Sequence, residues 1–426
     1  MGTVRPCRLA PDSGRGVWLA GCQEPRRALF CRDRTEAFAM AREADVDVFP
    51  AFESLLGMSL LEAAPLRGDT RGTEPCVHFQ QALAEDPQNH VCRIVHAGIA
   101  GDCANSTPVY AWGSQELKAA LAERPDQLAA ALDSRNGVCI ADRPTLTHHL
   151  GCMAYCVAID NSDLLPPFLP WVRNEDGVFG ALIEALMPKT VSADLPWGVV
   201  HDSPGRNSST AADSAWRPCV ADLVIALLHP AARAVRFGTL AEMTAEVGRA
   251  FLRYGEASDS SLKDFCTEVS LSRLRHHLTR ISEWQDVFSA GGMSVDSFRG
   301  ALIRSSHSAL VAPPRDLAHS TYENSWDGLR HLFHDFGSLL VQWPALWSAA
   351  HAVRKSGQLD HAARGGRAVA TVGQAGAEGR DVHAAAARPR KAAGRGPHWD
   401  GTAANPVERQ AGRAAQPRGD PRQSFV

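Results

Sequence analysis

The chain has 426 residues, of which 45% are hydrophobic and 21% are charged, and its formal net charge at pH 7 is −3. This length predicts roughly two to four domains, and the hydrophobic content excludes a wholly disordered chain. The near-zero charge argues against a protein that binds nucleic acid or anionic membranes through a basic surface, so we expect no nucleic acid among its partners.

The cysteines and the apolar segments bear on the compartment. None of the eleven cysteines forms a C-x-x-C pair, which favours reduced, buried thiols over a disulfide framework. The opening residues "MGTVRPCRLAPDSGRG" lack the apolar stretch of a signal peptide. The most apolar segment, residues 219–235, contains Asp222 and Pro230 and is too short to span a bilayer. We therefore expect a cytoplasmic protein without a transmembrane segment.

Residues 1–205 alternate between apolar runs and amphipathic stretches. The apolar runs predict strands at residues 16–21, 27–32, 76–83, 92–101, 137–142 and 153–159. Helices are predicted at residues 33–44, 114–132 and 177–187. This alternation indicates an α/β domain with a mixed sheet and flanking helices.

Residues 206–355 predict a second, all-helical domain. Apolar residues recur at spacings of three and four in residues 240–255, 271–288 and 328–353. The last stretch carries one apolar stripe, typical of a core-facing helix, formed by Leu329, Leu332, Phe333, Phe336, Leu339, Leu340 and Trp343. Asn324 and Ser325 are candidate N-caps for it.

The remaining residues, 356–426, predict a disordered tail. They are rich in Ala, Gly, Arg and Pro and nearly free of large aliphatic side chains. Such a segment cannot bury enough apolar surface to offset the entropy lost on ordering.

Residues 170–182, "PWVRNEDGVFGAL", place two carboxylates at a predicted helix start. Asn174 is a suitable N-cap, and Glu175 and Asp176 fall in the first turn, where the helix dipole favours negative charge. The pair is therefore either a helix cap or acid/base equipment. It cannot be the opposed carboxylate pair of a glycosidase, because adjacent helical residues point in different directions.

The wider segment "GCMAYCVAIDNSDLLPPFLPWVRNEDGVFGALI", followed by "LPWGVVHDSPGR", resembles GT-A-type nucleotide-sugar glycosyltransferases of the family 2 kind. The likeness covers residues 90–205. It implies transfer of a sugar from a nucleotide-sugar donor to an unknown acceptor, with Asp176 as the catalytic base and Glu175 beside it. It also implies substrate binding by Asp102, Arg173 and Asn174.

The resemblance further implies a divalent cation, Mn²⁺ or Mg²⁺, with His201 as a ligand. The alternative for His201 is an imidazole at a strand end without a ligand role. The family's D-x-D motif has one literal match, Asp45-Val46-Asp47, which we interpret as a solvated turn rather than a metal site. We therefore expect a partial GT-A-like sheet that begins after the nucleotide-binding half, and the alternative function is a non-catalytic interaction protein.

Two further groups of residues have ordinary structural explanations. The Gly-rich stretch 96–112 lacks a phosphate-binding pattern, and a turn is its simpler interpretation. His148, His149, Cys152 and Cys156 could suggest zinc, but a strand cannot turn all four inward, so we predict buried cysteines in a strand.

Overall fold

The structure is a computed structural model of the whole chain. All described residues lie in one compact unit, Met1–Leu359. The predicted disordered tail lies outside the described residues, apart from Ser356. The described residues are 6–8, 18–21, 26–31, 34–43, 47–63, 77–102, 109–113, 115–133, 136–148, 150–152, 155–172, 174–201, 218–233, 238–309, 313–314, 316–317 and 321–356.

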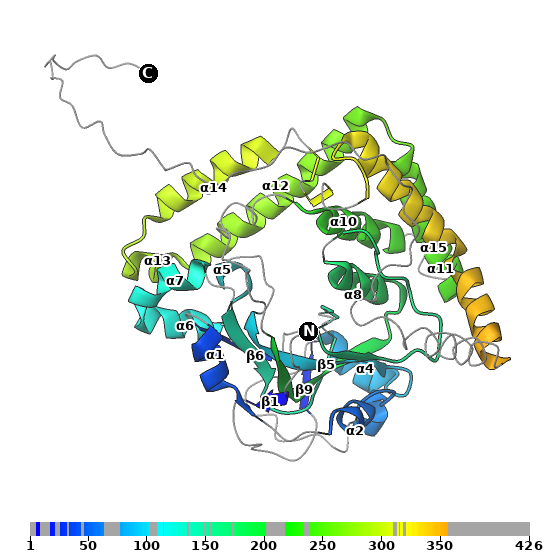
Figure 1. Cartoon of the computed structure of the whole chain (residues 1–426), viewed down its shortest axis with the longest axis horizontal. Coiled ribbons are helices and arrows are strands. Elements are labelled where there is room, and N and C mark those ends of the chain that lie inside the picture. Colours follow the sequence, from blue (N-terminus) through cyan, green and yellow to red (C-terminus); the bar gives the residue numbers. More distant parts are fainter. Residues whose placement is uncertain are drawn as a thin grey trace, which may run out of the picture. The chain divides into compact units, whose positions relative to one another are not determined.

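Within the described residues, nine strands form one mixed sheet, which confirms the α/β class (Figure 1). The main path follows the order β2 (Trp18–Gly21), β7 (Thr145–Thr147), β9 (Thr190–His201), β5 (Val91–Asp102), β6 (Asn136–Ala141) and β3 (Arg26–Phe30). Three short strands join this path: β1 (Pro6–Arg8), β4 (Arg42–Glu43) and β8 (Val157–Ile159).

The two long central strands, β5 and β9, run parallel and hold the two halves of the sheet together. Their first halves pair antiparallel with β8 and β7, and their second halves with β6 and β1. The register shifts once between Cys92 and Ile94 and again between His96 and Gly98. Nearly every residue of β5 is buried, because helices cover both faces of the sheet.

One face of the central strands packs against short helices. Side chains at alternate positions of β9, such as Val191, Ala193 and Trp197, share a core with Phe52 and Leu60. The covering helices are α2 (Val48–Glu53), α3 (Leu60–Ala63) and α4 (Val77–Glu85). A smaller cluster under α1 (Arg34–Met40) covers the neighbouring part of the sheet.

The opposite face packs against α8 (Glu175–Leu186). Ile94 of β5 shares a core with Phe179 and Ile183 of this helix. The chain around Leu150 packs closely against α8, because a Cβ on Gly180 would lie 2.2 Å from the carbonyl oxygen of Leu150. Met187 to Lys189 connect α8 directly to β9, so the helix runs antiparallel to the strand.

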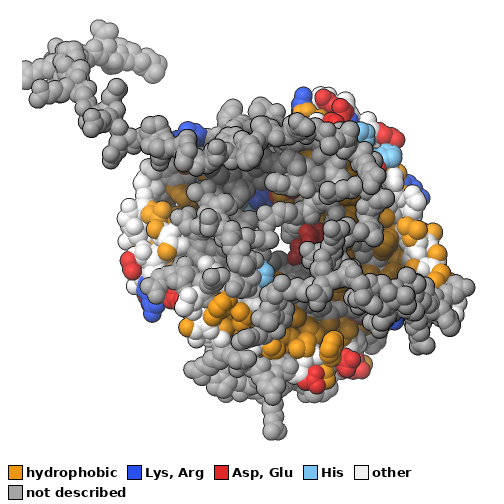
Figure 2. Space-filling model, in the orientation of Figure 1, with side chains coloured by type: hydrophobic (Ala, Val, Ile, Leu, Met, Phe, Trp, Pro, Cys, Tyr) orange, Lys and Arg blue, Asp and Glu red, His pale blue; other side chains and the backbone are white. Residues whose placement is uncertain are grey.

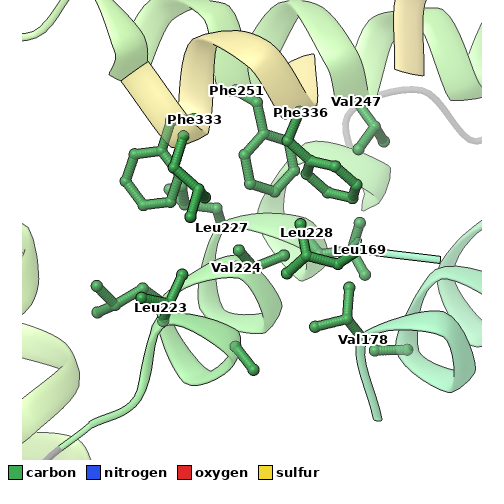
Figure 3. Packing of buried hydrophobic residues seen from close by; sticks show 14 of the residues in the cluster. Leu169, Val178, Leu223, Val224, Leu227, Leu228, Val247, Phe251, Phe333 and Phe336 are labelled. Atoms are coloured by element: carbon green, nitrogen blue, oxygen red, sulfur yellow. The ribbon is translucent and has the colours of Figure 1, made fainter. Parts of the chain in front are cut away.

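The helical region forms two further cores. In the larger one, Phe251, Phe333 and Phe336 face Leu227 and Leu228 (Figure 3). It joins α8 to α10 (Val220–Arg233), α11 (Leu240–Gly255), α12 (Asp259–Glu283) and α15 (Trp326–Lys355). The α/β and helical regions therefore share one core within the first compact unit.

The second helical core is built around α12. It contains apolar side chains of α5 (Val109–Trp112), α6 (Gln115–Glu123), α7 (Leu128–Asp133), α13 (Gln285–Ala290) and α14 (Val295–Ala309). A short 3₁₀ helix, η2 (Pro125–Gln127), separates α6 from α7 where the sequence predicts one continuous helix. The proline explains the break, since it cannot donate a backbone hydrogen bond.

The helices α11 and α15 cross with almost no space between their backbones. A Cβ on Gly248 would lie 2.7 Å from the carbonyl oxygen of Gly337, and a Cβ on Gly337 would lie 2.7 Å from that of Gly248. Beyond this crossing, Leu346 remains exposed on α15, and Figure 2 shows hydrophobic side chains gathered over α11 and α15.

One predicted strand is wrong in the described residues, and another is shorter than predicted. Residues 76–83 lie mostly in the helix α4 (Val77–Glu85), because Gln, Ala, Leu and Glu continue the segment with good helix formers. The strand predicted at residues 153–159 is formed at Val157–Ile159, so neither Cys152 nor Cys156 lies in a strand. Cys152 is buried in a segment without regular secondary structure, and the strand β8 begins only at Val157.

Candidate functional site

The site lies at the carboxyl ends of the parallel strands β5 and β9. These strands end at Asp102 and His201, and Gly101 is in register with His201. His201 Nδ1 lies 2.6 Å from the backbone carbonyl oxygen of Asp102. In open α/β sheets, ligands bind outside the carboxyl ends of such strands, so the structure brings these two predicted residues together at a suitable edge.

The hydrogen bond to Asp102 determines the tautomer of His201. A carbonyl oxygen can only accept, so Nδ1 must carry the proton. In the neutral ring the lone pair is then on Nε2, which is the form that binds a metal or accepts a proton. The imidazole is thus oriented by the backbone of the neighbouring strand.

Gly101 allows the two strand ends to approach this closely. Its φ is +108°, a conformation that residues with a side chain rarely adopt, and a Cβ there would lie 2.3 Å from the carbonyl oxygen of His201. A larger residue at position 101 would therefore push β5 away from β9 and disturb the contact between Asp102 and His201.

The start of α8 places Asp176 and Glu175 as predicted but arranges Asn174 differently. Asn174 is the N-cap by position, with a φ of 66°, yet its side chain makes no capping hydrogen bond. Instead, the carboxamide lies over Gly177, where a Cβ would be 2.5 Å from Asn174 Oδ1. The prediction that the Asn174 side chain caps the helix is therefore wrong, and the same side chain fills the space above Gly177.

Asp176 is held by the first turn of its own helix. Its Oδ1 accepts a hydrogen bond of 2.8 Å from the backbone N–H of Gly177, and the residue is partly buried. Glu175 is exposed. The bond to Gly177 satisfies one of the N–H groups that a helix start leaves unpaired, so the capping interpretation of Asp176 has direct structural support.

The depth of Asp176 relative to the strand ends follows from the antiparallel packing of α8 on β9. The helix rises about 15 Å between Leu186 and Asp176, at about 1.5 Å per residue. A strand covers the same distance in about five residues, so Asp176 is level with the middle of β9. His201 then lies about 15–20 Å further along the strand direction. The two residues therefore lie at different depths along the strand direction.

Sequence reasoning missed a buried polar group at the depth of Asp176. His96 of β5 is in register with Asp194 of β9, and Thr145 of β7 is in register with Asp194 on its other side. Only 2%, 3% and 1% of the surfaces of His96, Asp194 and Thr145 are exposed. All three share the face that α8 covers, since Ile94, two residues before His96, packs against that helix.

The described residues do not form a site for the expected Mn²⁺ or Mg²⁺. They contain no group of three or more His, Cys, Asp or Glu side chains that could hold a metal ion. Such cations prefer several oxygen ligands. Asp47 is exposed at the start of α2 without a side-chain capping bond, which agrees with a solvated turn, whereas Asp45 and the predicted substrate residue Arg173 lie outside the described residues.

None of the helices in the described part of the chain combines the length and the hydropathy that a membrane span requires. Comparison with protein-family models, with curated proteins and with solved structures finds no match to this chain.

Proposed function

We propose that the protein is a glycosyltransferase that moves a sugar from a nucleotide-sugar donor to an acceptor hydroxyl. The observation that carries the proposal is the position of Asp176. It stands partly buried in the first turn of α8, the helix that packs on the face of the sheet carrying Ile94. The carboxyl ends of β5 and β9, where an α/β sheet binds its ligands, lie further along the same strands.

In the proposed reaction, Asp176 is the general base. The acceptor oxygen attacks the anomeric carbon while its proton passes to the Asp176 carboxylate, and the bond between the anomeric carbon and the donor phosphate oxygen breaks. The nucleoside diphosphate leaves with the electron pair of that bond. A positioned base contributes typically 10²–10⁴-fold to such a step. The Gly177 N–H, 2.8 Å from Oδ1, fixes the orientation of the carboxylate.

The neighbouring residues have supporting roles in this proposal. Glu175 is exposed beside the base and would hydrogen-bond acceptor hydroxyls. Asp102 and His201 lie further along the strands, where they would contact the donor. Their mutual hydrogen bond keeps the His201 ring in one orientation, which favours a defined contact over a mobile one.

The test compares Asp176→Asn with Asp296→Asn. Asp296 is also a first-turn carboxylate, in α14, and its side chain is 95% exposed and paired only at 3.6 Å with Arg299 among the described ion pairs. Transfer is measured with a panel of radiolabelled nucleotide sugars and mixed acceptors. We expect Asp176→Asn to lower transfer at least 100-fold and Asp296→Asn to leave it unchanged, with both variants folded. Equal transfer in both variants would show that Asp176 is a helix cap.

A non-catalytic interaction protein is the second candidate. The carboxamide of Asn174 occupies the space above Gly177 next to the proposed base, and this favours a packed helix start over an open acceptor site. A chain that neither transfers nor hydrolyses any nucleotide sugar, and whose melting temperature is unchanged by uridine, guanosine and adenosine diphosphates, would support this candidate.

A further inference from the structure

We propose that α12 is a brace that couples α5 to α10, the first described helices after β5 and β9 respectively. The effect on activity rests on the proposed function, whereas the brace itself follows from the contacts of α12 with α5 and α10. The strand β5 ends at Asp102, and β9 ends at His201. Figure 1 shows α12 extending from α5 past α10.

The first contact of the brace is with α5. Arg280 of α12 donates from Nε to the carbonyl oxygen of Tyr110 at 3.1 Å and from Nη2 to that of Gly113 at 2.9 Å. These carbonyls belong to the end of a four-residue helix, where backbone acceptors lack helical partners. The planar guanidinium satisfies two of them at once, a geometry that lysine cannot reproduce.

Buried aromatic packing fixes α5 against the same face of α12. The Tyr110 hydroxyl lies 3.4 Å from Nδ1 of His277, and the Tyr110 side chain is fully buried. Next to it, a Cβ on Gly113 would lie 2.8 Å from the ring of Trp284. The end of α5 therefore has little freedom to move relative to α12.

The second contact of the brace is with the start of α10. Arg273 donates from Nη1 to Asp222 Oδ1 at 2.5 Å, and Asp222 Oδ2 accepts a hydrogen bond of 2.7 Å from the backbone N–H of Cys219. The Arg273 and Asp222 side chains are 28% and 20% exposed, so solvent screens this pair only in part. The same carboxylate thus caps α10 and joins it to α12.

The described contacts hold two pairs of elements together. The strand ends are joined by the hydrogen bond between His201 and Asp102. The helices α5 and α10 are held by Arg280 and Arg273, which are two helical turns apart, or about 10 Å along one rigid helix. Moving either anchor requires moving α12 and therefore the other anchor. Arg273 and Arg280 are positioning residues in this proposal, since they act through α5 and α10.

The experiment uses the full chain with Arg273→Ala, Arg280→Ala and the control Arg299→Ala. Arg299 of α14 also binds α12, through Ser282 Oγ at 2.7 Å, but it contacts neither α5 nor α10 in the described hydrogen bonds. Hydrogen exchange is followed by mass spectrometry in residues 109–113 and 219–223. We expect Arg273→Ala to speed exchange in 109–113, and Arg280→Ala in 219–223, each at least threefold. Arg299→Ala should change neither segment.

If each variant loosens only the segment that it touches, the two arginines are separate structural contacts and the brace is overturned. Activity gives a second readout if the chain transfers sugar. Both anchor variants should then lower kcat/KM at least tenfold without a matching loss of folded protein, and Arg273→Lys should recover more than Arg280→Lys. Absence of transfer in the wild-type chain would defeat the proposed function alone, because the exchange experiment does not depend on it.

Discussion

His96 and Asp194 lie directly opposite each other on the parallel strands β5 and β9, and both are buried. Their backbones are about 4.8 Å apart, the usual spacing of paired strands, and their side chains share one face. A pair of this kind between two otherwise apolar strands also specifies their register, since a shift by one residue would turn each side chain to the opposite face.

This relationship predicts strong coupling between the two side chains. We predict that these two buried side chains interact, so that replacing one leaves the other without compensation and His96→Gln and Asp194→Asn each lower the free energy of unfolding by about 2–4 kcal/mol. The double variant should lose at least about 1 kcal/mol less than the sum of the single variants. Urea denaturation of the four proteins measures this.

Ile94→Val is the control for this cycle, because it changes the same strand and face and should cost about 0.5–1.5 kcal/mol. Its effect should add to that of Asp194→Asn. Additive effects of His96→Gln and Asp194→Asn would mean that the two side chains do not interact.

The crossing of α11 and α15 predicts opposite effects for two similar substitutions. Gly248→Ala places a Cβ 2.7 Å from a backbone oxygen, so the helices must separate and we expect a loss of about 2–4 kcal/mol. Gly300→Ala, in the exposed helix α14, meets only the end of the Arg304 side chain at 3.3 Å. It should stabilise the protein by about 0.5–1 kcal/mol, because alanine favours helix more than glycine does. Melting temperatures that fall equally in both variants would contradict the close crossing.

The capping box at the start of α11 predicts a pH dependence of stability. Hydrogen bonds from the backbone N–H and the hydroxyl of Thr239 lower the pKa of Glu242 below its usual value near 4.5. The stabilisation from the ionised Glu242 carboxylate is therefore complete at pH values above its usual pKa. It is lost as the pH falls through the lower pKa that Glu242 has in the folded state. Glu242→Gln and Thr239→Ala should both reduce the decrease in unfolding free energy between pH 6 and pH 3.

Chemical denaturation across this range tests the capping box, and Gly300→Ala should retain the slope of the wild-type chain. A slope that is the same in Glu242→Gln and in the wild type would show that the carboxylate of Glu242 gains nothing from Thr239 on folding.

The buried thiols should react slowly. Burial raises the pKa of Cys7 to about 11 and that of Cys266 to about 12, and it also raises the pKa values of Cys92 and Cys219. Since the thiolate is the reactive form, these four residues should resist iodoacetamide at pH 8 and react fully in denaturant. Peptide mass spectrometry reads each position separately. Rapid labelling of Cys92 in the native chain would contradict its burial.

The sequence predicts α11 and α15 well because their signals are local, whereas the helix predicted at 271–288 is divided at Trp284 between α12 and α13. The helix at residues 240–255 has the bounds expected, since Thr239 and Glu242 form a complete capping box at its start. Ser325 rather than Asn324 caps α15, with its side chain accepting from the Gly328 N–H. The apolar spacing of α15 was enough to identify Phe333 and Phe336 as core residues.

The central sheet and the site were harder to predict because they depend on distant residues. β9 was not predicted although Val191, Ala193, Leu195 and Trp197 alternate with other residues as in a strand, and Pro196 argues against a central strand. The pairing of His96 with Asp194 depends on an irregular register between strands almost a hundred residues apart. The different depths of Asp176 and His201 arise because a strand advances about twice as far per residue as a helix does.

The large helical core has a consequence for the order in which the chain can mature on the ribosome. Val247 and Phe251 are made well before Phe333 and Phe336, the side chains that cover them. Until α15 has been synthesised, the apolar faces of α10 and α11 have no partner there and are open to association with other nascent chains or chaperones. Arrest of translation between residues 256 and 325 should thus produce a species far more prone to aggregate than release after residue 356.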